Sequence, residues 1–201
     1  MASRARKRLT GEERRDKILS AAVRAFAADG YDHTSMDRIA ALSKVTKPVL
    51  YDHFPSKQAL FMTVLASIRD GLIANGNAIA KAGDGPELTF RRAVDAFFQF
   101  VEGRPDAARV LLTVPRGDTA ATNMSREVQA GATAGIAAML AAVMPGSASW
   151  RRQAAAAFLK EGLHATAEWW LEHPGPSREE VVELVTGLVW TGQSAKTRER
   201  N

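Results

Sequence analysis

The sequence predicts an all-α protein in which a head of three helices is followed by a longer helical body, about nine helices in all. Two observations predict this class. Apolar residues recur every three or four positions through most of the 201 residues, and no stretch alternates apolar with polar residues as a half-buried strand would. Capping residues, glycines and prolines divide this helical pattern into segments.

The head is expected between residues 10 and 55, after a basic segment at 1–9 that we expect to be disordered. Its first helix begins at Thr10, where Glu13 completes a capping box, and ends at Gly30, because glycine favours the left-handed conformation found after helices. A short helix over 35–42 has Thr34 as its expected cap. A turn of about three residues leads into a second short helix, which tolerates Pro48 in its first turn. Two short helices joined by a tight turn form a helix-turn-helix, whose second helix can enter the major groove of DNA.

The residues of this second short helix are more specific than its geometry. Ile39-Ala40, followed by VTKPVLYDHFPSK over 45–57, closely resembles the signature of the TetR family of transcriptional regulators, and the resemblance covers about residues 15–65. Family members usually carry glycine in the turn, where this chain has Lys44 after Ser43. A lysine in a left-handed position costs about 1 kcal/mol, so we expect either local strain or a slightly different turn.

Charge and composition agree with a surface that meets nucleic acid. Residues 1–57 contain twelve Lys or Arg and seven Asp or Glu, whereas residues 58–201 contain fifteen of each. The whole net charge of +5 therefore lies with the helix-turn-helix, where phosphates would bind. The chain has no cysteine, which excludes disulfides and thiolate zinc sites, and it shows no export signal. We therefore expect a cytoplasmic protein.

The body, residues 56–201, is expected to provide ligand binding and dimerisation. Its helices are expected at about 56–82, 87–103, 105–114, 119–144, 149–173 and 177–193. The first of them joins head to body as a lever. Residues 128–150 carry no charge, but Pro145-Gly146 interrupts them and the Ala- and Gly-rich remainder is too weakly apolar to cross a bilayer, so we expect no membrane partner.

Two adjacent apolar stripes run along the helix at 149–173. One contains Phe158, Gly162, Ala165 and Trp169, and the other contains Leu159, Leu163, Thr166 and Trp170. The core of one monomer needs a single stripe, so either one of them meets its own copy in a homodimer or both are core. TetR regulators dimerise through their last two long helices, so this resemblance agrees with such a pairing. The pattern does not decide which stripe faces the partner; we assign the interface to Phe158, Gly162, Ala165, Trp169, Val185, Leu188 and Val189.

The expected contacts with double-stranded DNA lie in and around the helix-turn-helix. Lys47, Pro48 and Val49 are assigned to the groove floor and Thr46 to the turn before them, because Lys can donate to guanine edges while Pro and Val can meet a thymine methyl. Phosphate contacts are assigned to Thr34, Ser35, Lys44, Tyr51, His53 and Lys57. A dimer would read two inverted half-sites one helical turn, ~34 Å, or somewhat more apart. Residues 1–9 are either an arm that reaches a neighbouring groove or a plain tail.

The resemblance also implies a small, largely apolar effector in the body. The residues expected around it are Phe97, Phe98, Val101, Leu111, Met124, Val128, Met139, Leu163 and His164. A stripe of aromatic and Met residues is more often solid core, which is the alternative. Effector binding would change the separation of the two heads through segments 105–114 and 56–82, with a coupling of ~1–3 kcal/mol, and would release the DNA. The sequence thus predicts a ligand-responsive repressor that binds a palindromic operator.

Two other functions stay open. One is a DNA-binding regulator with a filled body and no effector. The other is a helical metal-dependent enzyme, since His164 and Glu168 lie four residues apart on one helix. Two ligands without a third are a weak signal, and the sequence has no Gly-rich phosphate loop, nucleophile elbow or paired-His motif. We therefore expect no enzyme, no cofactor and no metal.

Overall fold

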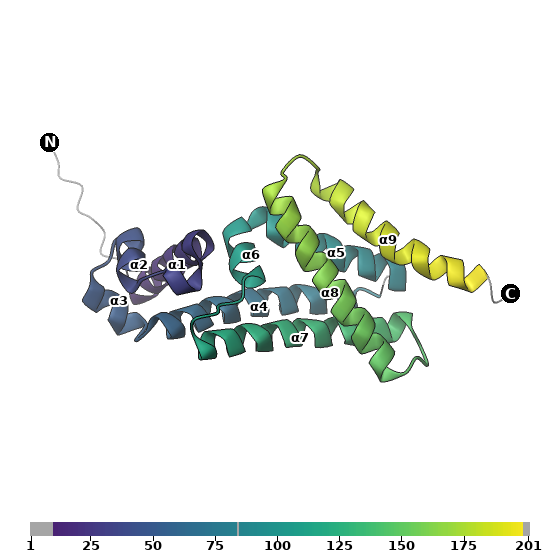
Figure 1. The fold of residues 1–201 in the computed structure, drawn as a ribbon, viewed down its shortest axis with the longest axis horizontal. Coiled ribbons are helices and arrows are strands. Elements are labelled where there is room, and N and C mark those ends of the chain that lie inside the picture. Colours follow the sequence, from purple (N-terminus) through teal and green to yellow (C-terminus); the bar gives the residue numbers. More distant parts are fainter. Residues whose placement is uncertain (1–9, 84, 199–201) are drawn as a thin grey trace.

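The computed structural model describes residues 10–83 and 85–198, which form α-helices joined by short connections with no strand among them. The predicted basic arm at 1–9 lies outside the described residues. In Figure 1 the chain is elongated, with α1 to α3 at one end and α8 and α9 toward the other. The helices are α1 (Gly11–His33), α2 (Met36–Ser43), α3 (Lys47–His53), α4 (Lys57–Lys81), α5 (Pro86–Gly103), α6 (Pro105–Leu112), α7 (Thr119–Val143), α8 (Ser149–Glu172) and α9 (Arg178–Arg198). The predicted all-α class with an N-terminal helix-turn-helix is confirmed; below, α1–α3 are the head and α4–α9 the body.

The first helix begins and breaks where the sequence predicts. The Thr10 hydroxyl oxygen accepts from the Glu13 N–H at 3.1 Å, and the Glu13 carboxylate accepts from the Thr10 N–H at 2.7 Å, so the capping box is complete. Gly30, at φ 72° and ψ 164°, adopts a conformation open almost only to glycine. Helical structure resumes beyond this break and ends at His33, one turn later than predicted.

The cap of α2 differs from the prediction. Ser35, not Thr34, is the N-cap, and its Oγ accepts from the Arg38 N–H at 3.2 Å. The Thr34 side chain is buried instead, and its hydroxyl donates to the Gly30 carbonyl at 2.6 Å. The pattern alone could not distinguish two adjacent hydroxyl residues. Lys44 occupies the predicted left-handed position at φ 56° and ψ 37°, so the turn keeps its geometry without glycine.

The apolar core forms two clusters. The first joins the head to α4, α6 and α7 through Ile18, Phe26, Ile39, Leu50, Phe54, Phe61, Val110 and Val128. The second joins α5, α8 and α9, with Val94, Phe98, Leu159, Trp170 and Val181 among its members. The first cluster is therefore continuous from the head into α4 and α6, with no break in the packing between them. The domain boundary at residue 55 stays a prediction.

The remaining helices follow the predicted segments, except that α9 continues to Arg198, beyond the expected end at 193. Each of α4 to α8 begins and ends within about two residues of its expected limits. Before α9, Ser177 and Glu180 form the second capping box, with the Ser177 N–H donating to the Glu180 carboxylate at 2.7 Å. None of the described helices is both long and apolar enough to span a bilayer.

Candidate nucleic-acid interface

The surface of α3 faces outward at the head end of the molecule (Figure 1). Leu50 is fully buried and fixes the inner side of this short helix to the first core cluster. Val49 and His53 are half-buried at its edges. On the outer side the structure brings together four exposed residues: Thr46, Lys47 and Pro48 of the predicted groove contacts and Tyr51 of the predicted phosphate contacts.

Local packing keeps α3 short and in place. Pro48 lies in its first turn, where no carbonyl partner is lost, and Phe54 ends it with an extended backbone. The Phe54 ring is buried, and the Arg15 guanidinium lies 4.4 Å from its centre, so α1 is held against the end of α3. Thr46 precedes the helix without making a side-chain cap, which leaves its hydroxyl for another partner.

Lys47, the central basic residue of this face, has an internal partner. Its ammonium lies 2.7 Å from the Asp37 carboxylate of α2, and the two side chains are 58% and 63% exposed. An exposed ion pair contributes at most about 1 kcal/mol, because water screens it. A phosphate or a guanine edge can therefore replace Asp37 at small cost.

The predicted phosphate contacts divide into two groups. Ser35 and Lys44 are exposed beside α3. Thr34 is buried, as described above, and Lys57 is directed inward, where its Nζ donates to the Tyr31 carbonyl at 2.9 Å and lies 4.4 Å above the Tyr31 ring. The structure thus places Lys57 at the carboxyl end of α1, where a positive charge stabilises the last carbonyls.

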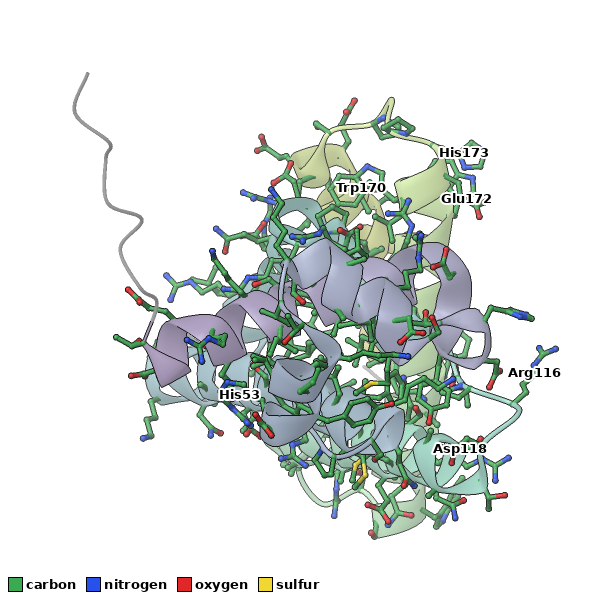
Figure 2. The ribbon with its side chains drawn as sticks, turned by 90° about the vertical axis from the view of Figure 1, so that its left-hand side faces the viewer. His53, Arg116, Asp118, Trp170, Glu172 and His173 are labelled. Atoms are coloured by element: carbon green, nitrogen blue, oxygen red, sulfur yellow. The ribbon has the colours of Figure 1, made fainter. Side chains whose placement is uncertain are left out.

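A second polar site, which the sequence analysis missed, connects head and body. The Asp32 carboxylate accepts from the backbone N–H groups of Arg116 and Gly117, each at 3.0 Å. The Tyr31 hydroxyl donates to Asp118 at 2.5 Å, and Asp118 also caps the start of α7. In Figure 2 Arg116 and Asp118 lie on the opposite side of the ribbon from His53. We call this set the head–body junction: Tyr31, Asp32, Arg116, Gly117 and Asp118.

The ionisation states in the junction favour these hydrogen bonds. The backbone N–H of Arg116 lowers the pKa of Asp32, and the Tyr31 hydroxyl lowers the pKa of Asp118. Burial raises the pKa of the Tyr31 phenol, and its bond to Asp118 raises it further. Near neutral pH both carboxylates are therefore charged acceptors and the phenol stays a donor.

The predicted effector residues are packed in the interior. Four of them are buried, namely Phe98, Val101, Leu111 and Val128, and five are half-buried, namely Phe97, Met124, Met139, Leu163 and His164. No third metal ligand joins His164 and Glu168 among the described residues. None of the nine lines either of two cavities that the structure shows, one of about 10 Å³ under α1 and one of about 340 Å³ between α5 and α9.

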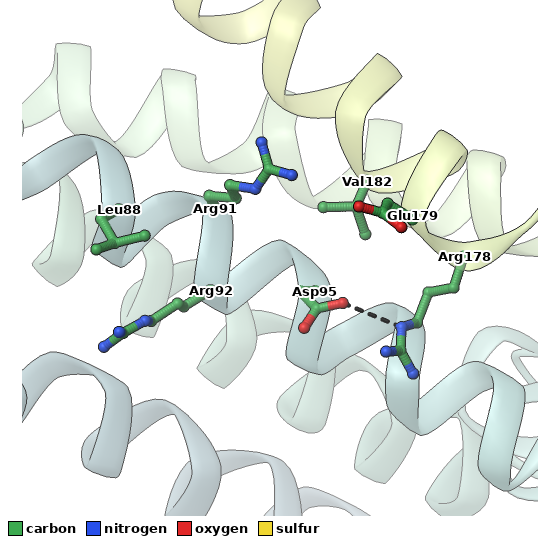
Figure 3. A pocket seen from close by; sticks show the side chains of 7 residues that line it. All are labelled: Leu88, Arg91, Arg92, Asp95, Arg178, Glu179 and Val182. Carbon is green, nitrogen blue, oxygen red and sulfur yellow. Dashed lines mark ion pairs between the residues drawn. The ribbon is translucent and has the colours of Figure 1, made fainter.

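The larger cavity lies between α5 and α9 (Figure 3). Its lining is Leu88, Arg91, Arg92, Asp95, Arg178, Glu179 and Val182. Arg178, at the start of α9, lies 3.0 Å from Asp95 and 2.8 Å from Glu102 of α5. This arginine therefore fixes α9 along α5 and is already paired with two carboxylates.

The two apolar stripes of α8 have different surroundings. Leu159 and Trp170 belong to the second core cluster. In the other stripe Phe158 is 76% exposed and Trp169 47% exposed, with Gly162 and Ala165 exposed between them. On α9 the exposed apolar residues are Leu184 and Leu188, whereas Val185 and Val189 pack against the core cluster. Of the expected interface, the α8 stripe and Leu188 thus lie on an open apolar surface, which also includes Leu184.

A known protein family matches the head and the first part of α4. The family described as "Bacterial regulatory proteins, tetR family" matches residues 18–64, from α1 through the helix-turn-helix into α4. Over these residues the chain matches the TetR family, which confirms the resemblance predicted from the sequence. The matched family consists of regulatory proteins, in agreement with the expectation that the chain is not an enzyme.

Two curated TetR-type relatives and one solved structure show how far the similarity extends. The HTH-type transcriptional activator FasR of Mycolicibacterium smegmatis is 38% identical over 104 residues, which are 52% of this chain and 48% of FasR. The nucleoid occlusion factor SlmA of Salmonella paratyphi B is 32% identical over 108 residues, which are 53% and 54% of the two chains. The match thus spans about half the length of these relatives. A TetR-like transcriptional regulator from Rhodococcus sp. RHA1 has the same fold, with a TM-score of 0.79 at 24% identity over 93% of this chain and 99% of that one.

Proposed function

We propose that this TetR-family protein is a transcriptional regulator that binds double-stranded DNA through α3. The exposed face of Thr46, Lys47, Pro48 and Tyr51, held rigid by the buried Leu50, carries this proposal. The face has a positive charge, two groups that can donate hydrogen bonds and an apolar contact surface, which is the chemistry that recognises base edges in the major groove. Ser35 and Lys44 lie beside it, where phosphates would pass.

The proposed DNA-binding unit is a homodimer. The open apolar surface of Phe158, Trp169, Leu184 and Leu188 lies on α8 and α9, away from the head. A patch of large exposed apolar side chains is unfavourable in water and is typical of a protein interface. Pairing two copies across a two-fold axis would place two α3 helices for a palindromic operator.

The regulation we propose is release from the operator on binding of a small effector in the body. The support is the continuous route from α5–α8 through α6 to the head: Leu111 and Val110 of α6 belong to the same core cluster as Ile18 and Phe26 of α1. The head–body junction joins the segment after α6 to the end of α1 with three further hydrogen bonds. A change in the position of α6 or α7 would therefore tilt the head and change the spacing of the two α3 helices.

The output on transcription is proposed to be repression. The relative FasR bears the name of a transcriptional activator, and this similarity favours activation as a second candidate. A promoter fused to the selected operator and transcribed in vitro, with and without the protein, separates the two. Repression lowers transcript yield, and activation raises it.

The test of DNA binding is selection of duplexes from a random pool, followed by titration of the selected sequence. Lys47→Ala should lower the affinity for DNA strongly. It should also make that affinity less dependent on salt concentration, because one basic contact is lost. Lys81→Ala, an exposed lysine at the far end of α4, serves as the matched control and should leave binding unchanged. Selection of no common sequence, or equal effects of the two substitutions, contradicts the assignment of α3.

A further inference from the structure

A polar cluster lies in the body where α7 meets α8. Ser125 and Gln129 are four residues apart on α7, and Lys160 and His164 are four residues apart on α8, so each pair lies on one face of its helix. Lys160 Nζ lies 3.4 Å from Gln129 Oε1, which joins the two faces. Neither the DNA-binding face nor the open apolar surface includes these side chains.

Lys160 is buried, whereas the carboxylate that it pairs with is exposed to solvent. The residue is only 9% exposed and adjoins Leu159 of the second core cluster. Its acceptors are Gln129 Oε1 at 3.4 Å and Glu161 at 2.7 Å, and the Glu161 side chain is 70% exposed. Burying an ammonium costs free energy unless a charge compensates it, and a carboxylate in water compensates weakly. On its buried side, Lys160 therefore has donor capacity beyond one long hydrogen bond.

Ser125 is a second and independent sign of a missing polar group. It is 3% exposed, and its Oγ has no hydrogen-bond partner among the described residues. Buried hydroxyl groups are nearly always paired, so an unpaired one needs an explanation. Gln129, one turn further along α7, uses its Nε2 to donate to the Leu111 carbonyl of α6 at 2.9 Å, which turns its oxygen toward Lys160.

Half-buried apolar side chains lie close to this cluster. The His164 ring is stacked on the Phe97 ring with centres 6.0 Å apart, which brings α5 to the same place. Phe97, Leu163 and Met124 are each half-buried. Met adapts its shape readily, so the neighbourhood can open around an apolar group.

We propose that Lys160 and Ser125 bind the carboxylate of an amphipathic organic acid, whose apolar part lies between α5, α7 and α8. This inference rests on the ligand-responsive function proposed above and assigns the effector an anionic end, where the sequence predicted a largely apolar molecule. A carboxylate supplies the acceptor that the Ser125 hydroxyl lacks, and it brings Lys160 a buried negative charge in addition to the exposed Glu161. Gln129 connects the bound acid to α6 and so to the route toward the head.

The test uses the full chain with decanoate and its neutral counterpart decanamide as probes, measured by isothermal titration calorimetry. Decanoate should bind roughly tenfold or more tightly than decanamide, as expected for a charge-assisted hydrogen bond in a buried site. Lys160→Met should remove this difference, and Lys160→Arg should restore part of it. Ser125→Ala should weaken binding of decanoate more than binding of decanamide. Lys81→Met is the control and should change neither.

The stability of the unliganded protein separates a binding role from a packing role. Because the site holds an incompletely compensated charge, Lys160→Met should raise the Tm of the unliganded protein. A lower Tm together with equal loss of both probes would show that Lys160 only supports the fold, and would overturn the inference.

Titrations of the selected operator in the presence of each probe separate this inference from the proposed function. Equal affinities of the unaltered protein for decanoate and decanamide, or no binding of decanoate, overturn the carboxylate site. If decanamide releases the protein from the operator as effectively as decanoate does, the regulator is ligand-responsive and this inference fails. If decanoate binds through Lys160 and the affinity for DNA stays constant, the site is correct and the proposed regulation fails.

Discussion

Substitutions on the two sides of the head–body junction, at Asp32 and at Gly117, should lower the free energy of unfolding by about the same amount. A Cβ added at Gly117 would lie 2.8 Å from Asp32 Oδ1, closer than a Cβ comes to a non-bonded heavy atom in folded proteins. Gly117→Ala therefore expels the Asp32 carboxylate and breaks its two hydrogen bonds to Arg116 and Gly117, each 3.0 Å long. Asp32→Ala removes the same two bonds. Asp32 is exposed, so water replaces part of the loss, and we expect each variant to lose about 1–2 kcal/mol of unfolding free energy.

The assay is urea unfolding at one fixed protein concentration, because the stability of the proposed dimer would depend on concentration. The double variant should be about as stable as either single variant, which gives a coupling energy of about 1–2 kcal/mol. Gly131→Ala on α7 is the matched control: no heavy atom lies within 4 Å of its added Cβ, and it should gain about 0.5–1 kcal/mol from helix propensity. The reasoning would be refuted if the two losses of unfolding free energy added up in the double variant. It would also be refuted if the Gly117→Ala protein were as stable as the Gly131→Ala control.

Three further predictions follow from single sites. Lys44→Gly should raise the unfolding free energy by about 1 kcal/mol, because φ 56° strains a residue with a side chain, and urea unfolding that shows no gain would contradict this. Phe158→Glu should give a monomer in size-exclusion chromatography with light scattering while helical circular dichroism is unchanged, since the side chain is 76% exposed; a persistent dimer would exclude this surface as the interface. Burial lowers the pKa of His164, and the charge of Lys160 lowers it further, so the unfolded chain takes up a proton below about pH 6.5 that the folded chain does not. Unfolding free energy should therefore decrease as the pH falls from about 6.5, and an unaltered slope in His164→Gln would exclude this residue as the cause.

Helix boundaries could be predicted from the sequence because their causes are local. The capping box of Thr10 and Glu13 and the break at Gly30 each depend on a few neighbouring residues, and the structure contains both. The left-handed Lys44 was one of two alternatives that followed from the resemblance to the TetR family, whose members usually carry glycine in this turn. Thr34 and Ser35 show the limit of such signals: both can cap a helix, and packing decides which hydroxyl turns inward.

The junction and the polar cluster could not be predicted in this way. Asp32 meets Gly117 across 85 positions of the chain, and Lys160 meets Gln129 across 31, so no periodicity links the partners. Each carboxylate or ammonium, considered alone, resembles a solvated side chain. A weak signal did exist for Lys160, which adjoins Leu159 in one of the apolar stripes of α8, but a lysine beside apolar residues more often extends its charge into water.

The central claim is that two copies of this chain hold one DNA duplex, each through its α3. The most direct measurement is the mass of the complex between the purified protein and the selected operator, determined by light scattering, together with the same measurement on Lys47→Ala. We predict two chains, or a multiple of two, per duplex, and loss of the complex at moderate salt when Lys47 is replaced. A single chain on the duplex, or a complex that Lys47→Ala leaves unchanged, would contradict the account.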